Sequence, residues 1–441
     1  MAEVIIRGGV VVTVDSESRI VKGDVVCRDG TIAQVGGDAT PIEDDYEILD
    51  AEGCIVMPGL AQSHIHMCQT LARGRADDLE LLDWLRNVVW PYEGALGEDD
   101  VAAAARLSCA ELLRGGTTAI MDMGTVHHTD RLFEVARDAG IRATIGKAMM
   151  DSDTAGHPSG LNETSEWSLA ESIRLCEEWH GEADGRLRYA FAPRFALSCT
   201  DGLLRDAADA AREHGARIHT HSSENRDEID LVRAQRGADN IPYLRSVGIA
   251  GPDVGLAHCV WLDDEEREIL RATGTHVLHC PSSNLKLASG IALIPELIAQ
   301  GISVSLGADG APCNNNLDGF FEMRLAALIH KPRAGSRAMR ASEVVRLATM
   351  GGAAALGLDH AIGSLEVHKR ADIAVVDATG AHVQPTENPY SALVYACRST
   401  DVVHVLVDGK VVVRDRELMT LDVERAARDA AARARKLFAT L

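Results

Sequence analysis

The middle of the chain alternates short apolar runs with longer amphipathic segments, and this pattern constrains the fold most strongly. Several of the amphipathic segments have helical spacing and end at glycine, which is preferred after a helix. Parallel strands need a crossover, usually a helix, and eight such units close into a barrel. We therefore predict an α/β chain with a TIM-like (β/α)8 barrel. The predicted strands are residues 55–60, 118–123, 143–149, 187–193, 216–221, 254–260, 275–280 and 302–307.

Both ends of the chain read as short strands separated by turns. Near the C-terminus, Asp408-Gly409 stands between two β-branched runs, which is typical of a tight hairpin. The two β-rich ends therefore predict one small β-sandwich domain, built from residues 1–56 and 363–420. The barrel is expected over 57–362, and the Ala/Arg-rich segment 421–441 is expected to be helical.

Composition narrows the functional classes. Of the 441 residues, 46% are hydrophobic and 25% charged, as in an ordinary globular protein. The net charge of −22 repels phosphate backbones, so we expect no nucleic-acid partner. No apolar run approaches the ~18–20 residues that span a bilayer, and the first residues lack the basic start of a signal peptide. We expect a cytoplasmic protein with no membrane partner.

Polar side chains recur where the predicted strands end. His64 and His66 follow the first apolar run, and His221, His258 and Asp309 end three later ones. Residues i and i+2 of a strand point to the same side, and barrel enzymes place their chemistry at the carboxyl ends of the strands. The pattern predicts one divalent metal ion, with water in an open position. The predicted ligands are His64, His66, His221 and Asp309.

The remaining groups suit hydrolysis. A bound metal lowers the pKa of water to roughly 7–9. We assign Asp309 as the group that takes a proton from that water. His258 is assigned to orient the water or stabilise the developing alkoxide, and Glu224 to protonate a substrate nitrogen. The competing interpretation of Glu224 is a solvated loop acid. A lone histidine at a strand end is usually structural, and we assign that role to His219, His276 and His279.

The motifs resemble the amidohydrolase superfamily, in particular the branch of S-adenosylhomocysteine/methylthioadenosine deaminases, guanine deaminases and triazine hydrolases. The similarity extends over nearly the whole chain. It is carried by Pro58-Gly59-Leu60 before His64-Ile65-His66, by His221-Ser222-Ser223-Glu224, by Ala257-His258-Cys259, by 279–284 and by 307–311. The resemblance implies zinc, with Fe²⁺ as the alternative, and a β-sandwich made from both termini. Binuclear members typically have a lysine at the end of strand four, where this chain has Arg194, so one metal ion is favoured.

Two substrate patterns are mixed. The segments around Trp84, Trp90 and Glu93 are similar to the S-adenosylhomocysteine/methylthioadenosine deaminases, in which the residue matching Glu93 binds ribose hydroxyls. That family usually has Pro-His at the end of strand four and an arginine near the end of strand three. This chain has Pro193-Arg194 and Lys147 instead.

The segment 192–200 is more similar to guanine deaminases, in which the arginine contacts the base. An arginine fork suits a carbonyl or ring nitrogen of an oxopurine or pterin. The alternative interpretation of Arg194 is a salt-bridged residue at the rim of the barrel. Trp84, Trp90 and Phe195 are candidates to stack on a planar ring, or are simply packing residues. The predicted substrate-binding residues are Glu93, Arg194, Trp84, Trp90, Lys147 and Asn284.

We therefore predict an aminohydrolase that releases ammonia from an amino-substituted N-heterocycle. The candidate substrates are an oxopurine or pterin, or a 5′-modified adenosine. A triazine-type chlorohydrolase is one alternative, and a non-catalytic metal-binding barrel is another. The expected partner is a small-molecule heterocycle, and we expect a homo-oligomer.

Overall fold

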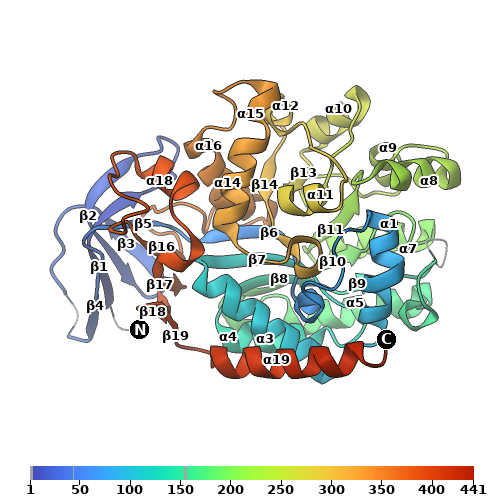
Figure 1. Ribbon diagram of the computed structural model, residues 1–441, viewed down its shortest axis with the longest axis horizontal. Coiled ribbons are helices and arrows are strands. Elements are labelled where there is room, and N and C mark those ends of the chain that lie inside the picture. Colours follow the sequence, from blue (N-terminus) through green and yellow to red (C-terminus); the bar gives the residue numbers. More distant parts are fainter. Residues whose placement is uncertain (1–2, 43, 153–155) are drawn as a thin grey trace.

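The computed structural model describes residues 3–42, 44–152 and 156–441. A curled parallel sheet surrounded by helices lies beside a second, mixed sheet that contains both ends of the chain (Figure 1). This arrangement confirms the predicted TIM-like barrel with an additional β-rich part. Within the described residues, no helix is long and apolar enough to cross a membrane.

The strands of the barrel follow one another around the sheet, each parallel to the next. The ring closes because the chain passes from the eighth strand into a two-residue strand, β15, which pairs with β6 through Asp309↔Ile65 and Gly310↔His66. The strands are β6 (Leu60–His66), β7 (Thr117–Met123), β8 (Arg142–Gly146), β9 (Ala148–Met149), β10 (Leu187–Pro193), β11 (Arg217–Ser222), β12 (Val254–His258), β13 (His276–His279), β14 (Val304–Leu306) and β15 (Asp309–Gly310).

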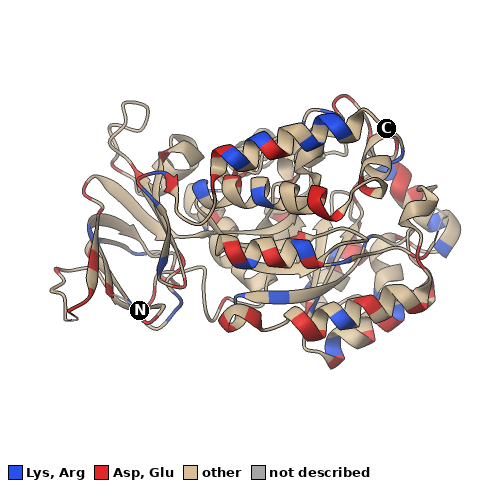
Figure 2. Cartoon of the chain, turned by 90° about the horizontal axis from the view of Figure 1, so that it is seen from below, with Lys and Arg blue, Asp and Glu red and all other residues tan. Residues whose placement is uncertain are grey.

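Helices cover the outside of the barrel, and in Figure 2 charged residues gather on them. Those between the strands are α1 (Leu81–Trp84), α2 (Trp90–Gly94), α3 (Glu98–Arg114), α4 (Asp130–Ala139), α5 (Ser165–Trp179), α6 (Glu182–Gly185), α7 (Asp201–Glu213), α8 (Arg226–Arg236), α9 (Asn240–Ser246), α10 (Asp264–Thr273), α11 (Pro281–Lys286) and α12 (Ile294–Ala299).

Later in the chain come α13 (Ala311–Asn314), α14 (Gly319–Ile329), α15 (Lys331–Ala334), α16 (Ala341–Arg346), α17 (Gly352–Ala355), α18 (Pro389–Tyr395) and α19 (Val423–Phe438). The predicted C-terminal helix is α19, which packs on α3 (Figure 1). Short 3-10 or π segments are η1 (Met67–Ala72), η2 (Leu85–Val89), η3 (Ser159–Leu161), η4 (Leu347–Gly351) and η5 (Ser399–Asp401).

The mixed sheet joins both termini. Its order is β19-β18-β17-β16-β5-β1-β2-β3, with β4 beside β1. The predicted hairpin is present, because Asp408 and Gly409 have φ of +50° and +72° between β17 and β18, as the favoured hairpin turns require. The strands are β1 (Glu3–Val12), β2 (Ile20–Arg28), β3 (Thr31–Val35), β4 (Tyr46–Asp50), β5 (Cys54–Pro58), β16 (Ile373–Asp377), β17 (Val402–Val407), β18 (Lys410–Arg414) and β19 (Glu417–Leu418).

The prediction of residues 55–60 as the first barrel strand was wrong. The apolar run belongs to β5, which pairs with β1 and β16 in the mixed sheet, and the first barrel strand is β6. Gly59 separates the two strands at a point of close approach, since a Cβ there would lie 2.1 Å from Thr118 Oγ1. His64 and His66 are therefore part of β6 itself, at its carboxyl end.

A buried arginine ties the barrel to the mixed sheet. Arg142, at the start of β8, donates from Nε to Asp372 Oδ2 over 2.8 Å and from Nη2 to Asp372 Oδ1 over 3.0 Å. The same guanidinium pairs with Asp408 in the β17–β18 turn. Because all three groups are buried, the two sheets share one desolvated charge network.

Removing this arginine should destabilise the fold. Loss of one partner of a buried ion pair costs about 3–5 kcal/mol, so we expect Arg142→Ala to lower the free energy of unfolding by that order in a urea titration. Arg428→Ala is the control, because its ion pair with Glu424 is exposed, and it should unfold near the wild-type midpoint. An R142A protein as stable as this control would contradict the assignment.

Candidate metal centre and active site

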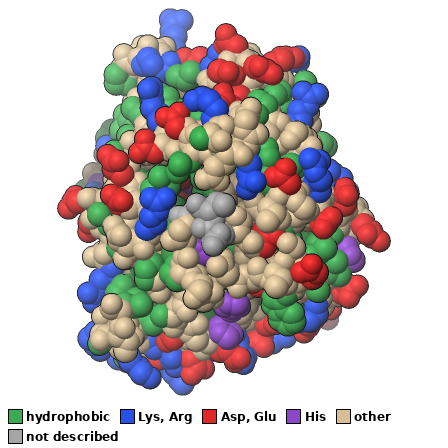
Figure 3. All heavy atoms as spheres, turned by 90° about the vertical axis from the view of Figure 1, so that its right-hand side faces the viewer, with side chains coloured by type: hydrophobic (Ala, Val, Ile, Leu, Met, Phe, Trp, Pro, Cys, Tyr) green, Lys and Arg blue, Asp and Glu red, His purple; other side chains and the backbone are tan. Residues whose placement is uncertain are grey.

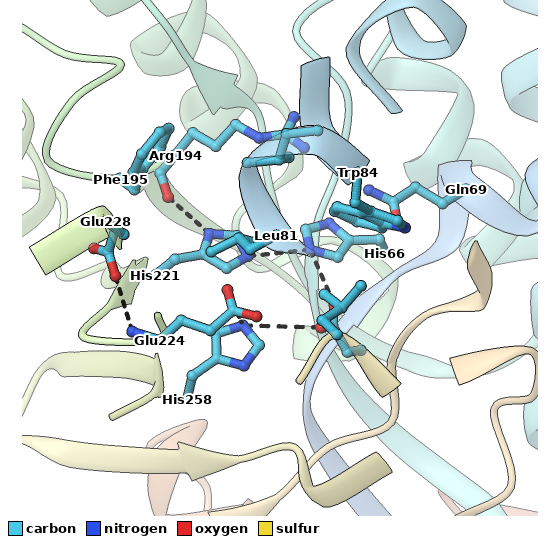
Figure 4. Close-up of a pocket in the computed structure, with 13 residues that line it drawn as sticks. His66, Gln69, Leu81, Trp84, Arg194, Phe195, His221, Glu224, Glu228 and His258 are labelled. Atoms are coloured by element: carbon cyan, nitrogen blue, oxygen red, sulfur yellow. Dashed lines mark hydrogen bonds and ion pairs between the residues drawn. The ribbon is translucent and has the colours of Figure 1, made fainter. Parts of the chain in front are cut away.

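A cavity lies at the carboxyl ends of the barrel strands (Figure 4). One wall is apolar and comes from α1 and η2, and the opposite side carries the predicted polar residues. The η2 segment of this wall is a π-helical turn, and such turns are often found near functional sites. The lining residues are His66, Gln69, Leu81, Trp84, Leu85, Arg194, Phe195, His221, Glu224, Glu228, His258, Leu287 and Asp309.

The four predicted metal ligands come together at the floor of this cavity. His64 Nε2 and His66 Nε2 each lie 3.4 Å from Asp309 Oδ1. His66 Nε2 lies 3.3 Å from His221 Nε2. These distances would let one ion replace the direct contacts between the ring nitrogens and the carboxylate. His258 also belongs to the cluster, since one of its ring nitrogens lies within 4.8 Å of those of His64 and His221.

Hydrogen bonds behind the rings turn the Nε2 atoms toward the centre. His66 Nδ1 donates to Met123 O and His221 Nδ1 donates to Arg194 O, both over 2.7 Å. A proton on Nδ1 leaves the lone pair of Nε2 free, which is how protein scaffolds orient histidine ligands.

His219 plays the same part for His64, because the two rings meet at 2.7 Å between His219 Nε2 and His64 Nδ1. The sequence assigned His219 a structural role, and its position directly behind His64 explains that role. His64 Nε2 is fully buried and forms no hydrogen bond with any described residue. An orphaned buried acceptor is costly, and a metal ion would satisfy it.

The charge states also fit a metal. Burial holds the pKa of His66 at about 3 and the pKa of His221 well below its usual range, so both rings are neutral. Burial alone would raise the pKa of Asp309, but the rings of His64, His258 and His66 outweigh it and hold that pKa well below its usual range. Neutral imidazoles and an ionised carboxylate are the donors that divalent metals such as zinc prefer.

Glu224 and His258 face each other beside the ligand cluster. Glu224 Oε2 lies 3.5 Å from His258 Nε2, and His258 Nε2 lies 3.8 Å from Asp309 Oδ2. Burial raises the pKa of Glu224 to about 7, so this acid exchanges its proton near neutral pH. Burial lowers the pKa of His258, but the carboxylates of Glu224 and Asp309 outweigh it, and the net shift is upward.

Both His258 and Asp309 have left-handed backbone conformations, with φ of +74° and +61°. Such conformations are uncommon outside glycine and persist only where the surroundings hold them in place. Strain at two neighbouring polar strand ends is typical of a functional site.

Arg194 and Glu93, which the sequence offered as rival substrate contacts, bind each other. Arg194 Nη1 pairs closely with Glu93 Oε2, and Arg194 Nη2 donates to Glu93 Oε1 over 3.2 Å. Gln69 Nε2 donates to the same Oε1 over 2.8 Å. Arg194 and Gln69 line the cavity, whereas Glu93 lies behind them.

The other predicted substrate contacts lie at different depths. Trp84 lines the cavity, but Trp90 is packed edge-on against His157 with 5.6 Å between ring centroids. Lys147 is buried in an ion pair with Glu163 and does not reach the cavity lining. Asn284 Oδ1 accepts from His258 Nδ1 over 2.8 Å, so it supports a proposed catalytic group rather than lining the cavity.

Two polar lining residues were missed by the sequence reasoning. Gln69 follows His66 in η1 and carried no motif signal that distinguishes it from other loop amides. Glu228 was detectable as the capping-box acid three residues after the N-cap Asn225. Its Oε2 accepts from the backbone N–H of Glu224 over 2.9 Å, which fixes the loop that presents Glu224.

The fold and the donor set define a barrel with a metal-ligand cluster at its catalytic face. The Amidohydrolase family model matches residues 55–412, so the chain belongs to the Amidohydrolase family. This confirms the resemblance inferred from the motifs.

Two relatives match along almost their entire length. A 5-methylthioadenosine/S-adenosylhomocysteine deaminase of Syntrophobacter fumaroxidans is 40% identical over 96% of this chain and 95% of its own. A 5'-deoxyadenosine deaminase of Methanosarcina acetivorans is 37% identical over 100% of this chain and 99% of its own.

Three solved structures have a similar fold over nearly the whole chain. An adenosine deaminase from Xanthomonas campestris with bound zinc has a TM-score of 0.92 at 31% identity, covering 100% of this chain and 99% of its own. An atrazine chlorohydrolase from Arthrobacter aurescens, complexed with zinc, has a TM-score of 0.91 at 27% identity, covering 98% of this chain and 100% of its own. A guanine deaminase from C. acetobutylicum with bound guanine has a TM-score of 0.84 at 25% identity, covering 93% of this chain and 99% of its own.

Removal of a ligand histidine should abolish metal retention. We expect His64→Ala and His221→Ala to lose most of their zinc after loading and gel filtration, measured by mass spectrometry of the metal. His276→Ala is the control, because His276 bonds Ser303 and the Pro252 carbonyl at the start of β13. If H64A holds as much zinc as H276A, the metal site lies elsewhere.

Proposed function

We propose that this chain is a metal-dependent aminohydrolase that replaces the exocyclic amine of an oxo-substituted N-heterocycle, such as an oxopurine or a pterin, with oxygen. One observation carries the reaction type: two buried carboxyl groups 3.5 and 3.8 Å from the same His258 nitrogen have pKa values shifted in opposite directions. Such a divergence supports Glu224 as the acid and Asp309 as the base of a proton-transfer reaction.

The proposed metal content is one Zn²⁺ ion, with Fe²⁺ as the alternative. His64, His66, His221 and Asp309 would hold it, and the ion would supply the acidity that makes water a nucleophile near neutral pH. A second ion bridged by a carboxylated lysine is not expected, because Arg194 follows β10 and its guanidinium is committed to Glu93.

The protein groups then move the protons. Asp309, held ionised, accepts a proton from the attacking water, whose oxygen forms a bond to the amine-bearing carbon. Glu224, protonated below pH of about 7, donates to a ring nitrogen. His258, oriented by Asn284, stabilises the negative charge that develops on oxygen. The C–N bond breaks and ammonia leaves with the proton relayed from Asp309, while the remaining hydroxyl proton passes to the ionised Glu224, giving the oxo product and restoring the protonated acid.

Arg194 supports the substrate class. Its fork toward Glu93 fixes the guanidinium plane, and the same side chain lines the cavity. Two of the five N–H groups of the guanidinium donate to Glu93, so only the remaining ones could donate to a carbonyl or ring-nitrogen acceptor of the substrate. Trp84 and Phe195 also line the cavity and offer flat surfaces for a planar ring.

A 5′-modified adenosine is the second candidate, and the names of the relatives favour it. In that case Glu93 would accept from ribose hydroxyls. Both of its oxygens are already engaged by Arg194 and Gln69, so these bonds would have to open first. Trp90 and Lys147 would act only as support from behind the cavity.

Two further alternatives are less well supported. Dechlorination of a triazine needs no acid for a leaving amine, so the raised pKa of Glu224 favours deamination. A non-catalytic metal-binding barrel needs no proton-transfer groups at all. The proposed partner remains a small heterocycle rather than nucleic acid. On the face in Figure 3, basic and acidic side chains are interspersed, which supports this view. A homo-oligomer remains part of the proposal.

The pH profile tests the role of Glu224. Because the protonated acid is required, kcat/KM for ammonia release should fall about tenfold per pH unit as the pH rises above about 7. Glu224→Gln should lower kcat by about 10²–10⁴-fold and remove this limb. Glu266→Gln is the control, since burial raises the pKa of Glu266 to about 7 outside the cavity. An unchanged limb in E224Q would exclude Glu224 as the acid.

A substrate panel tests the proposed ring. Ammonia and chloride release would be measured with guanine, 8-oxoguanine, pterins, adenosine, methylthioadenosine, S-adenosylhomocysteine, melamine and atrazine. We expect ammonia from an oxo base, and Arg194→Gln should lower kcat/KM for that base by about 10–100-fold, the worth of a hydrogen bond to a charged group. Arg205→Gln, at an exposed position, is the control. Ammonia only from 5′-modified adenosines would favour the second candidate, and chloride would favour the triazine hydrolases.

A further inference from the structure

Glu322, on α14, is a buried carboxylate one layer behind the cavity, with 1% of its surface exposed. Three donors bind it. The backbone N–H and the hydroxyl of Ser282 donate over 3.2 Å and 2.5 Å, and Asn314 Nδ2 donates over 2.8 Å. Ser282 lies at the start of α11 and Asn314 at the end of α13, so one carboxylate joins the loops that follow two neighbouring barrel strands.

Each loop leads directly to a reacting group. Two residues after Ser282, on the same short helix, Asn284 accepts the Nδ1 hydrogen bond of His258. The Nδ2 group of Asn314 also donates to Ala308 O over 2.8 Å, and Ala308 immediately precedes Asp309. Glu322 is therefore two contacts away from both His258 and Asp309.

We propose that Glu322 is a positioning residue, which sets the orientation of His258 through Ser282 and Asn284 and that of Asp309 through Asn314 and Ala308. The inference rests on the proposed function, which gives His258 and Asp309 their roles. Both residues have left-handed backbone conformations, which persist only where surrounding bonds hold them. The Asn284–His258 and Asn314–Ala308 hydrogen bonds are two such bonds, and the contacts of Glu322 hold the helices that supply them.

The chemistry of the contacts requires a carboxylate. All three partners are donors, and an ionised acid offers acceptors on both oxygens. In Glu322→Gln one oxygen becomes an NH₂ group. If the amide oxygen faces Ser282 Oγ and Asn314, the new NH₂ opposes the Ser282 N–H, and the reverse orientation opposes the other two donors. In either orientation a buried donor is left unpaired, although the glutamine side chain has nearly the same size and shape as that of glutamate.

Glu322→Gln is the test, and Glu266→Gln is the matched control. Glu266 is another buried carboxylate, and it accepts from two backbone N–H groups, of Ile241 and Asp263, away from the cavity. We expect E322Q to lower kcat by about 10–100-fold with KM nearly unchanged, and to weaken zinc binding by about tenfold in competition with a chelator. E266Q should leave both unchanged. A merely structural loss would give the two variants the same kcat and zinc affinity, which would overturn the proposal.

A double mutant tests the route through Asn284. In an Asn284→Ala background, the loss of kcat caused by E322Q should become smaller than in the wild type, because one of the two contacts that transmit it is gone while the route through Asn314 remains. Full additivity would overturn the proposal. If E322Q does not fold, Ser282→Ala, which removes one donor only, should show a smaller loss of kcat in the same direction, and wild-type kcat in S282A would overturn it.

Failure of the proposed function would be recognised separately. If the wild-type enzyme releases ammonia from none of the panel, the reaction assigned above fails. The zinc affinities of E322Q and E266Q still decide whether Glu322 positions Asp309, since that measurement needs no turnover.

Discussion

The site depends on the hydrogen bonds formed by the Nδ1 atoms of its histidines. A ring that donates from Nδ1 to a carbonyl presents the lone pair of Nε2 on its other side, and His66 and His221 are both held in this way. Because the rings are deeply buried and neutral, their Nε2 lone pairs and the ionised Asp309 converge as acceptors that a cation would satisfy. The parallel barrel brings these side chains, far apart in sequence, to one edge, and the β15–β6 pairing brings Asp309 there as well.

The same burial that keeps the histidine rings neutral contributes to the separation between the pKa values of Glu224 and Asp309. Glu224 faces an apolar wall, and desolvation favours its protonated form. Asp309 is equally buried, but the surrounding imidazoles favour its ionised form. A single cavity thus keeps a proton donor and a proton acceptor on either side of His258. Hydrolysis of a carbon–nitrogen bond needs both, since the ring nitrogen gains a proton while water loses one.

The sequence predicted the barrel, the hairpin and the residues that cluster at the candidate metal site because these depend on local signals: apolar periodicity, an Asp-Gly turn and polar residues at strand ends. It misplaced the first barrel strand because the apolar run of β5 continues through Gly59 to Leu60, the first residue of β6, so the run does not mark where one sheet ends and the other begins. It also could not show that Arg194 and Glu93 bind each other, since 101 residues separate them. Pairings over such distances follow from the barrel's closure and leave no pattern in the chain.

Arg194 belongs to the metal centre and to the substrate cavity through different atoms. Its backbone carbonyl orients His221, whereas its side chain reaches Glu93 and the cavity. Any residue at this position supplies the carbonyl, so the side chain is free to vary without disturbing the ligand set. Changes in substrate preference at this strand end therefore need not pass through a metal-free, inactive intermediate. A lineage could exchange one ring system for another by single substitutions here while remaining a working hydrolase throughout.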